Sequence, residues 1–308
     1  MRWARYNDVI GLIHAQALEA AGDLEGAQSV YQHLYEDSAT RFLGIKGLAL
    51  IAQRLGETQK AYQYFETALQ LRPRSKWAVG ELLKCNRQLL LSDKQNQDTD
   101  DGVIQIDREG LKKRLKLLDK GVKLGLLNEE DALKDQIELL NVAAHRAMID
   151  ENSDLALQYA NEVIKKDKFN IEAVCLASRL LNGQNQLRKA LRLIEKTWAQ
   201  KPDPELARAY RDITTNKLDA AQQALKMERL AALCPDHPQS LLISGEALLE
   251  RENYEHARRD LTRALELQPD LSHLYTLLAK LEQKQYHDNE ASCKWLSKGL
   301  EFHKTNKS

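Results

Sequence analysis

Apolar and small residues recur along this chain with the spacing of an amphipathic helix. In residues 42–75, one group of them lies three, four or seven positions apart, and a second group follows Gly56. The two groups are Ile45, Leu48, Ala49 and Ala52, then Ala61, Phe65, Ala68 and the closing Pro73. Residues spaced in this way share one face of a helix, so the pattern predicts two helices joined near Gly56. Proline at the end of the segment stops further helix.

Residues 238–271 repeat this pattern position for position. Their two groups are Leu241, Gly245 and Leu248, then Tyr254, Ala257, Leu261 and Ala264, followed by Pro269. Small residues fall where two helices must approach closely, and large ones fill the space between neighbours. Both segments resemble the 34-residue tetratricopeptide repeat, and residues 42–75 carry the Ala-x3-Phe…Pro half of its signature.

Further copies in the same phase predict the organisation of the whole chain. Residues 92–101 are rich in Asp, Gln and Asn and interrupt one copy, which indicates a flexible loop. The fold class is therefore all-α, a single right-handed superhelical solenoid of about eight helix-turn-helix repeats over residues 1–308. The predicted repeats are about 8–41, 42–75, 76–127 (interrupted by a loop at 92–106), 137–170, 171–203, 204–237, 238–271 and 272–305.

Composition agrees with a helical fold and narrows the class of partner. Apolar residues make up 43% of the chain, enough for a continuous core, and charged residues make up 29%. The 45 Lys and Arg residues equal the 45 Asp and Glu residues, so the basic surplus of nucleic-acid binders is missing. The four cysteines form no CxxC pair, which favours a reducing compartment. No apolar run reaches the ~20 residues that cross a bilayer, so we expect the chain as given to be soluble.

The order of several segments resembles one family. The segments are HAQALEAAGD at 14–23, FLGIKGLA at 42–49, Trp198, PDPELA at 202–207, PDHP at 235–238 and KWL at 294–296. Together they are similar to the repeat region of the HemY family, membrane-anchored proteins of proteobacteria associated with haem biosynthesis. The resemblance implies the soluble part of an inner-membrane protein that faces the cytoplasm and is held by an N-terminal anchor. It also implies a scaffold around haem-pathway enzymes, with no cofactor of its own.

A stack of such repeats leaves a concave surface lined by the first helix of each repeat. Positions 2, 5, 9 and 12 of the repeat share one face of that helix. In the middle repeats these positions carry hydrogen-bonding and cationic groups, which suit an acidic or C-terminal peptide segment. The alternative is that the groups are merely solvated. The predicted groove residues are Lys46, Asn141, His145, Arg179, Asn182 and Arg208, with Gln239 and Glu246 flanking them.

A basic helix near residues 107–123 offers a second candidate surface. Its apolar residues Leu111, Leu115, Leu118 and Val122 recur at helical spacing, so we expect the helix to pack on that stripe. The lysines then cover the other side, either as a solvated face or as a contact for anionic lipid headgroups. The lysines predicted for such a membrane contact are Lys112, Lys113, Lys116 and Lys120.

Motifs of catalysis and metal binding are missing from the sequence, so we predict that the chain is not an enzyme. It has no HExxH, CxxC, GxSxG, GxxxxGK[ST] or GxGxxG. Cys234-Pro235 with His237 nearby resembles a haem-ligating group, since haem iron takes a thiolate or an imidazole. Pro235 is equally explained as a repeat terminator. A haem or porphyrin carrier and a general envelope-assembly adaptor therefore stay as alternatives to the scaffold.

Overall fold

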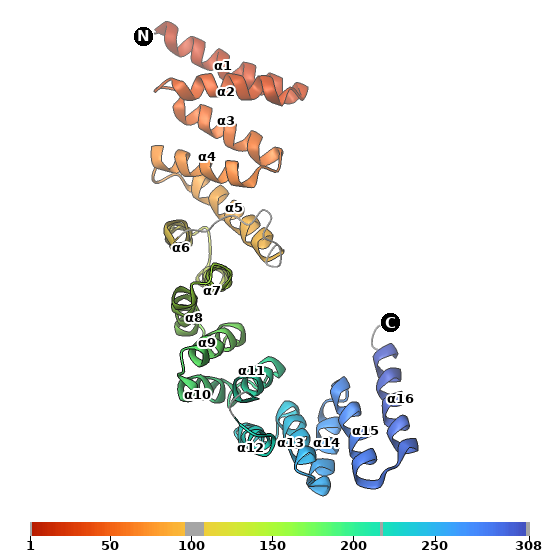
Figure 1. Ribbon diagram of the computed structural model, residues 1–308. Helices are drawn as coiled ribbons and strands as arrows, with labels where there is room; N and C mark the ends of the chain where they lie inside the picture. The colour runs from red at the N-terminus through yellow and green to blue at the C-terminus, as the bar shows by residue number, and fades with distance from the viewer. Residues whose placement is uncertain (1, 96–107, 216–217, 306–308) are drawn as a thin grey trace. The chain divides into compact units, whose positions relative to one another are not determined.

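The computed structural model describes the backbone of residues 2–95, 108–215 and 218–305, and the side chains of residues 9–92, 108–215 and 218–301. Within these ranges the chain forms 16 α-helices and no β-strand (Figure 1). The helices fall into two compact units, Met1–Asp150 and Glu151–Ser308. The prediction of an all-α helical repeat fold is confirmed, and the continuity of the repeats across the two units stays a prediction.

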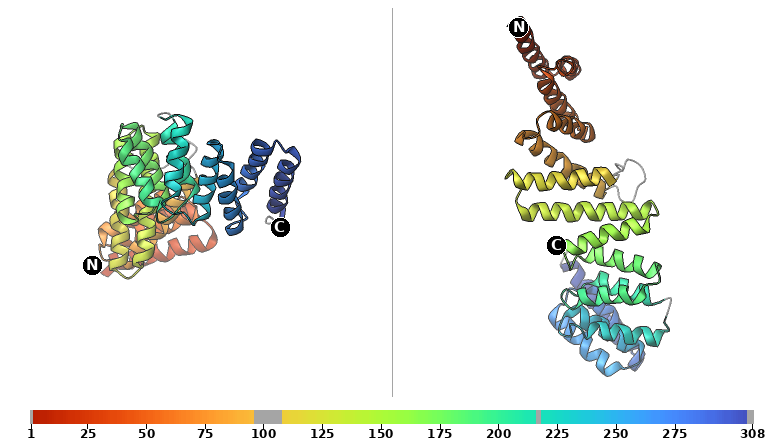
Figure 2. Two further views of the ribbon diagram at one scale, coloured as in Figure 1. Left: turned by 90° about the horizontal axis from the view of Figure 1, so that it is seen from below. Right: turned by 90° about the vertical axis from the view of Figure 1, so that its left-hand side faces the viewer.

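The first unit stacks its helices in chain order, so that each helix packs on the next (Figure 1). In the right-hand view of Figure 2, α6 and α7 run side by side. The helices are α1 (Arg2–Ala21), α2 (Leu24–Glu36), α3 (Arg41–Arg54), α4 (Thr58–Leu71), α5 (Lys76–Gln95), α6 (Arg108–Lys123) and α7 (Glu129–Ile149).

The second unit is built from α8 and four helical hairpins, α9–α10, α11–α12, α13–α14 and α15–α16. The first helix of each later hairpin also contacts the hairpin before it. The helices are α8 (Ser153–Lys166), α9 (Ile171–Gly183), α10 (Leu187–Trp198), α11 (Pro204–Thr215), α12 (Ala220–Ala231), α13 (Pro238–Glu250), α14 (Tyr254–Leu267), α15 (Ser272–Tyr286) and α16 (Asn289–Thr305).

Polar residues determine where many of these helices begin. The Asp23 side chain accepts a hydrogen bond of 2.8 Å from the backbone N–H of Gly26 at the start of α2. An N-cap of this kind is worth about 1 kcal/mol relative to alanine. Four further helices, α7, α8, α9 and α12, have the same cap from Asn128, Asn152, Asn170 and Asp219.

The turns within and between hairpins use residues with a left-handed backbone. In the first unit these residues are glycines, which adopt positive φ without a Cβ clash. In the second unit they carry side chains, and a left-handed residue with a Cβ costs about 1 kcal/mol or more. The glycines are Gly22, Gly56 and Gly125, and the others are Glu151, Asn185, Glu252 and His287.

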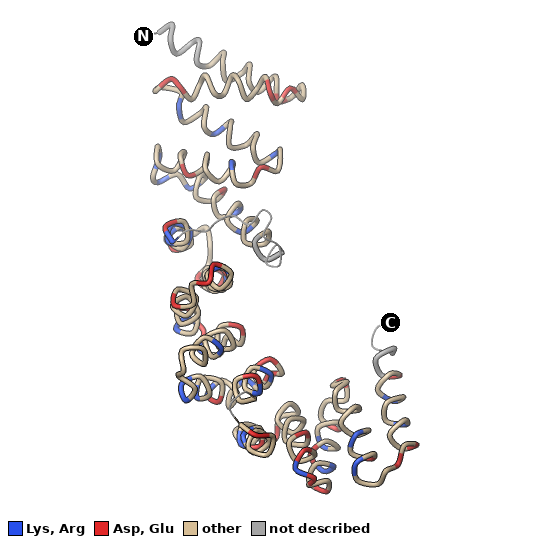
Figure 3. Tube along the Cα trace, in the orientation of Figure 1, with Lys and Arg blue, Asp and Glu red and all other residues tan. Residues whose placement is uncertain are grey.

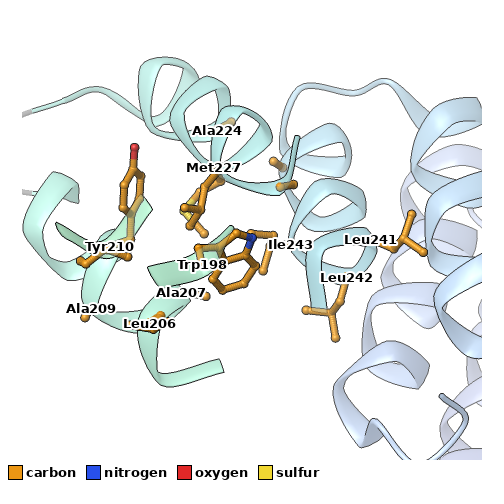
Figure 4. Packing of buried hydrophobic residues seen from close by; sticks show 14 of the residues in the cluster. Trp198, Leu206, Ala207, Ala209, Tyr210, Ala224, Met227, Leu241, Leu242 and Ile243 are labelled. Carbon is orange, nitrogen blue, oxygen red and sulfur yellow. The ribbon is translucent and has the colours of Figure 1, made fainter. Parts of the chain in front are cut away.

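Buried small residues lie at the helix crossings, as the repeat pattern predicts. Ala61 in α4 and Ala257 in α14 are fully buried. A Cβ added to Gly245 of α13 would lie 2.5 Å from Cγ of Leu261 in α14, so glycine is needed for that approach. Figure 4 shows the core beside these helices, where Trp198 lies near Met227 and Ile243. The indole N–H of Trp198 donates to the Ser240 hydroxyl at 3.1 Å, so no polar group of this ring is left unsatisfied.

The interrupted region differs in two details from the prediction. Helix α5 continues to Gln95, whereas the loop was expected to begin at residue 92. The extension is four residues long, Ser92 to Gln95, and its last two residues, Lys94 and Gln95, are good helix formers. Residues 96–107, most of the predicted loop, lie outside the described residues. Helix α7 begins at Glu129 behind the N-cap Asn128, and its acidic first turn interacts favourably with the helix dipole.

None of the described helices combines the length and the apolar character that a bilayer span requires.

Candidate functional site

A cavity of about 500 Å³ opens in the second unit where three successive hairpins meet. It is bordered by the first turns of α11 and α13 and by the turn that leads into α15. The lining residues are Pro204, Ala207, Arg208 and Arg211 from α11, Gln239, Leu242, Ile243 and Glu246 from α13, and Asp270, Leu271, Ser272 and His273 at the start of α15.

The local sequence explains why three helix N-termini border this cavity. Pro204 and Pro238 occupy the first positions of α11 and α13, where the missing proline N–H costs nothing. His237 caps α13, because its Nδ1 accepts the backbone N–H of Gln239 at 3.2 Å. Each helix start carries a partial positive charge from aligned peptide dipoles. These helix starts favour negatively charged groups, whereas the carboxylates of Glu246 and Asp270 at the same cavity oppose them.

An ionic network occupies one side of the cavity. Arg211 of α11 pairs with the Glu246 carboxylate of α13. The Nε2 atom of His273 lies 4.0 Å from the other Glu246 oxygen and forms a second ion pair when the imidazole is protonated. Burial alone would raise the pKa of Glu246, but His273 and Arg211 together hold it below its ordinary value. Glu246 is consequently ionised at neutral pH, with its charge compensated by its neighbours.

Two cavity residues keep hydrogen-bonding capacity that no described residue uses. Gln239 is only 8% exposed overall, and its side-chain amide, which makes no hydrogen bond to a described residue, is reached by solvent at the cavity. The Arg208 guanidinium is exposed at the rim and forms no ion pair within the described part of the chain. These two side chains are therefore suited to contact the oxygen atoms of a bound group.

The structure brings together only part of the predicted groove. Arg208 lines the cavity with Gln239 and Glu246, the two residues expected to flank the groove. Arg179 is exposed and Asn182 is half-buried on α9, and neither lines the cavity. Their role as groove residues stays a prediction.

The other predicted groove residues lie in the first unit. Asn141 is buried and His145 is half-buried on α7, so Asn141 offers little surface to a partner. The Lys46 ammonium lies 5.0 Å from the ring centroid of Trp77 in α5, a cation–π contact within the unit. These three residues stay predicted contacts.

Sequence reasoning missed several lining residues, and the repeat phase could have found two of them. Leu242 is at position 5 of the repeat that starts at Pro238, and His273 is at position 2 of the repeat that starts at Ser272; both lie on the face already assigned to the groove. Arg211 and Asp270 lie outside the four positions of that face. Their presence at the cavity depends on how three neighbouring hairpins are offset, which one repeat does not reveal.

The basic helix α6 packs on a different stripe from the one predicted. Leu111 and Leu118 are buried as expected, but Leu115 and Val122 are only half-buried. Arg114, another cation of this helix, is buried. Its guanidinium donates to the side chain and to the backbone carbonyl of Asn86 in α5, the latter at 3.1 Å. These acceptors compensate part of the cost of its burial.

The lysines predicted for a membrane contact remain accessible along α6, where Figure 3 marks Lys and Arg in blue. Lys112, Lys113 and Lys116 are exposed, and Lys120 is half-buried. Lys113 lies 3.6 Å from Glu109, one turn earlier, so part of its charge is compensated. Their contact with lipid headgroups stays a prediction.

The Cys234-Pro235 dipeptide lies in the turn between α12 and α13. Cys234 is half-buried against the core, and His237 uses Nδ1 for the helix cap. Burial lowers the pKa of His237, which keeps the imidazole neutral and able to accept that hydrogen bond. Capping thus accounts for His237 without a haem. Within the described residues, no group of three or more His, Cys, Asp or Glu side chains is placed to hold a metal ion.

Comparison with known protein families identifies repeats in two segments of the chain. Residues 47–75 and 238–271 match the family model of the tetratricopeptide repeat. These are the two segments whose apolar patterns agree position for position, and they form parts of α3–α4 and the whole of α13–α14. The chain therefore has an all-helical repeat fold in which these two segments are similar to the tetratricopeptide repeat. This class supports the interpretation of a protein-binding scaffold. A comparison with curated proteins found no match.

The solved structures to which this chain is similar have low sequence identity to it and low TM-scores. The chain is 16% identical to MamA from Desulfovibrio magneticus RS-1, over 56% of this chain and 97% of that one, with a TM-score of 0.36. A tetratricopeptide repeat protein from Parabacteroides merdae is 12% identical, with 95% and 98% of the two chains covered and a TM-score of 0.31. The P58(IPK) TPR domain is 14% identical, with 98% and 99% covered and a TM-score of 0.32. Such low scores support no inference about residues or partners.

Proposed function

We propose that this chain is a non-catalytic scaffold that holds an acidic segment of a partner protein in the cavity between α11, α13 and α15. The observation that carries the proposal is the pair of polar side chains at that cavity, Arg208 and the solvent-reached Gln239 amide, that lack partners among the described residues. A peptide carboxylate supplies what both lack, because its oxygens accept from a guanidinium and from an amide.

The remaining lining residues suit the same ligand. Arg211 and His273 compensate the charge of Glu246, so this carboxylate repels an incoming acidic group less than an unpaired one would. Leu242, Ile243 and Leu271 add apolar surface for the stems of the bound side chains. A volume of about 500 Å³ is in the range of small-ligand pockets and holds a few side chains of an extended peptide.

Fluorescence anisotropy with a labelled peptide tests this proposal. The probe is a hexapeptide of Asp and Glu with a free C-terminal carboxylate, and a Lys hexapeptide is the control. We expect Arg208→Glu to weaken binding of the acidic probe by about 10- to 100-fold, since a hydrogen bond to a charged group contributes about 1.5–3 kcal/mol. Arg192→Glu makes the same charge change at an exposed position of α10 outside the cavity and should leave the affinity nearly unchanged. Equal effects of the two variants would reject the cavity as the site.

The partner and the location that we propose derive from the family resemblance. The order of segments similar to HemY proteins supports haem-pathway enzymes as partners, at the cytoplasmic face of the bacterial inner membrane and with an N-terminal anchor. The exposed lysines of α6 support contact with anionic headgroups there, at about 1 kcal/mol for each basic residue near the surface.

Crosslinking on membranes of the source organism tests the partner. Enrichment of haem-synthesis enzymes that is lost in Arg208→Glu, and kept in Arg192→Glu, would support this function and its site. Enrichment of other envelope proteins would favour the envelope-assembly adaptor instead. A haem or porphyrin carrier predicts a shifted Soret band when haem is titrated into the protein, and an unshifted band would remove that alternative.

A further inference from the structure

Charged groups of both signs line the cavity between α11, α13 and α15, and their formal charges cancel. Arg208 and Arg211 of α11 are cationic, whereas Glu246 of α13 and Asp270 in the turn before α15 carry carboxylates. The remaining titratable residue of the lining is His273 of α15. The lining is therefore neutral when the imidazole is neutral, and it has one positive charge in excess when the imidazole is protonated.

His273 lies beside the ionic network and is open to solvent. It is the second residue of α15, and its side chain is 51% exposed. Its Nε2 atom lies 4.0 Å from one oxygen of the Glu246 carboxylate, and Arg211 pairs with the other oxygen. A proton can therefore reach the ring without any opening of the fold, and the charge that it adds lies next to Glu246.

The groups around His273 divide into those that favour its protonation and those that oppose it. Glu246 and Asp270 favour the imidazolium form, because they carry the opposite charge. Arg208, Arg211 and the positive end of the α15 dipole oppose it. Helices α14 and α16 also pack on α15, but neither supplies a described residue of the lining. A carboxylate bound in the cavity joins the groups that favour the imidazolium.

Binding of an anion and protonation of this ring are consequently linked. Histidine is the side chain whose charge ordinarily changes between about pH 5 and pH 8. An opposite charge within about 4–6 Å raises the pKa of an imidazole by about one or more. A ligand that favours the imidazolium is in turn bound more tightly by the protein that carries it, about tenfold for each pKa unit.

We propose that the cavity is a pH-sensitive binding site, in which protonation of His273 strengthens the hold on an acidic segment and a rise in pH weakens it. This inference rests on the proposed function, because it concerns the same cavity and the same class of ligand. It adds that a neutral lining becomes cationic as the pH falls, over a range in which carboxylates and guanidinium groups ordinarily keep their charges.

Fluorescence anisotropy with the hexapeptide of Asp and Glu tests this inference between about pH 5.5 and pH 8, at constant ionic strength. The carboxylates of the probe stay ionised over this range. We expect the affinity of the wild type to rise by about 5- to 10-fold as the pH falls. His273→Gln keeps a polar side chain that does not titrate, so its affinity should change by less than about twofold. The matched control is His256→Gln, at an exposed position of α14 outside the cavity, and it should keep the whole rise.

A second histidine near the cavity requires its own variant. His237 caps α13 through Nδ1, next to the lining residue Gln239, so protonation of His237 would remove an acceptor at that helix start. His237→Asn keeps a good capping side chain without a titrating ring, and it should retain the rise in affinity. A rise that is lost in His237→Asn and kept in His273→Gln would overturn the inference in favour of the cap.

Isothermal titration calorimetry in two buffers of different ionisation enthalpy measures the linked proton directly. Near pH 7 the wild type should take up part of a proton when it binds the probe, and His273→Gln should take up less. A wild-type affinity that does not change with pH would overturn this inference and leave the proposed function standing. Absence of binding at every pH would overturn both.

Discussion

The two glycines at the α2–α3 crossing offer a test of the packing that defines the repeats. We consider Gly44→Ala, with Gly80→Ala as its control. Both glycines lie inside helices of the first unit, and a methyl group on either raises helix propensity by up to about 1 kcal/mol. At Gly80 the new Cβ meets nothing within 4 Å. Gly80→Ala should therefore stabilise the unit by about 0.5–1 kcal/mol.

At Gly44 the same methyl group has no room. Its Cβ would lie 2.7 Å from both the Tyr31 carbonyl oxygen and Cα of Tyr35, and still closer to the Tyr35 backbone nitrogen. Carbon atoms pack best at about 3.5–4.0 Å, so α2 and α3 must separate by roughly 1 Å. These are backbone atoms and cannot rotate away, which places the overpacking cost near the upper end of the usual range, about 3 kcal/mol. After the gain in propensity, the net destabilisation is about 2 kcal/mol.

Urea unfolding followed by far-ultraviolet circular dichroism measures both changes. The two alanine variants should differ by about 3 kcal/mol, with midpoints on opposite sides of the wild type. If the two units unfold separately, the shift should be confined to the transition of the first unit. A Gly44→Ala midpoint equal to or above the wild type would show that α2 and α3 do not cross at this glycine.

Two further predictions follow from the titrating groups. His273 and Arg211 hold the pKa of Glu246 low in spite of its burial. Ionised Glu246 therefore stabilises the folded chain at pH values above its pKa in the unfolded chain, about 4.3. This stabilisation is lost as the pH falls through the lower pKa of Glu246 in the folded chain. Between about pH 5 and pH 3, the Tm of Glu246→Gln should therefore fall less than the Tm of the wild type or of the exposed control Glu266→Gln. Equal slopes of Tm against pH in all three proteins would contradict the ionic network. Burial raises the pKa of the Cys85 and Cys175 thiols to about 11, so at pH 8 iodoacetamide should alkylate the exposed Cys293 well before either of them. Mass spectrometry of peptides taken at timed intervals measures the three rates. Equal rates in the native protein would refute the burial of Cys85 and Cys175.

The helical repeats could be predicted from the sequence because their signal is local. Ala61, Gly245 and Ala257 each lie at helical spacing from the apolar residues of their own helix, and all three are buried at crossings in the structure. The helix starts were also readable, since Asn128 and its acidic neighbours carry a cap and a favourable dipole interaction. These features depend on residues within one or two turns of each other.

The candidate site was predicted only in part, because it depends on distant residues. Arg208 belongs to a face that the repeat positions define, whereas Arg211 reaches the cavity through its pairing with Glu246, 35 residues later. The burial of Arg114 has the same origin, since its acceptor Asn86 lies 28 residues earlier on another helix. A charged residue on a basic helix gives no local sign that such an acceptor exists.

The left-handed turns have a consequence for how this chain can change over time. Asn185 and Glu252 lie in turns of the second unit and do not line the cavity. Glycine at such a turn removes a Cβ clash of about 1 kcal/mol or more, although it also loosens the unfolded chain and so returns part of that gain. A substitution in the cavity that lowers stability by a similar amount can thus be compensated at a turn. Binding specificity and thermodynamic robustness are therefore separable traits in this chain, and they can evolve at different positions.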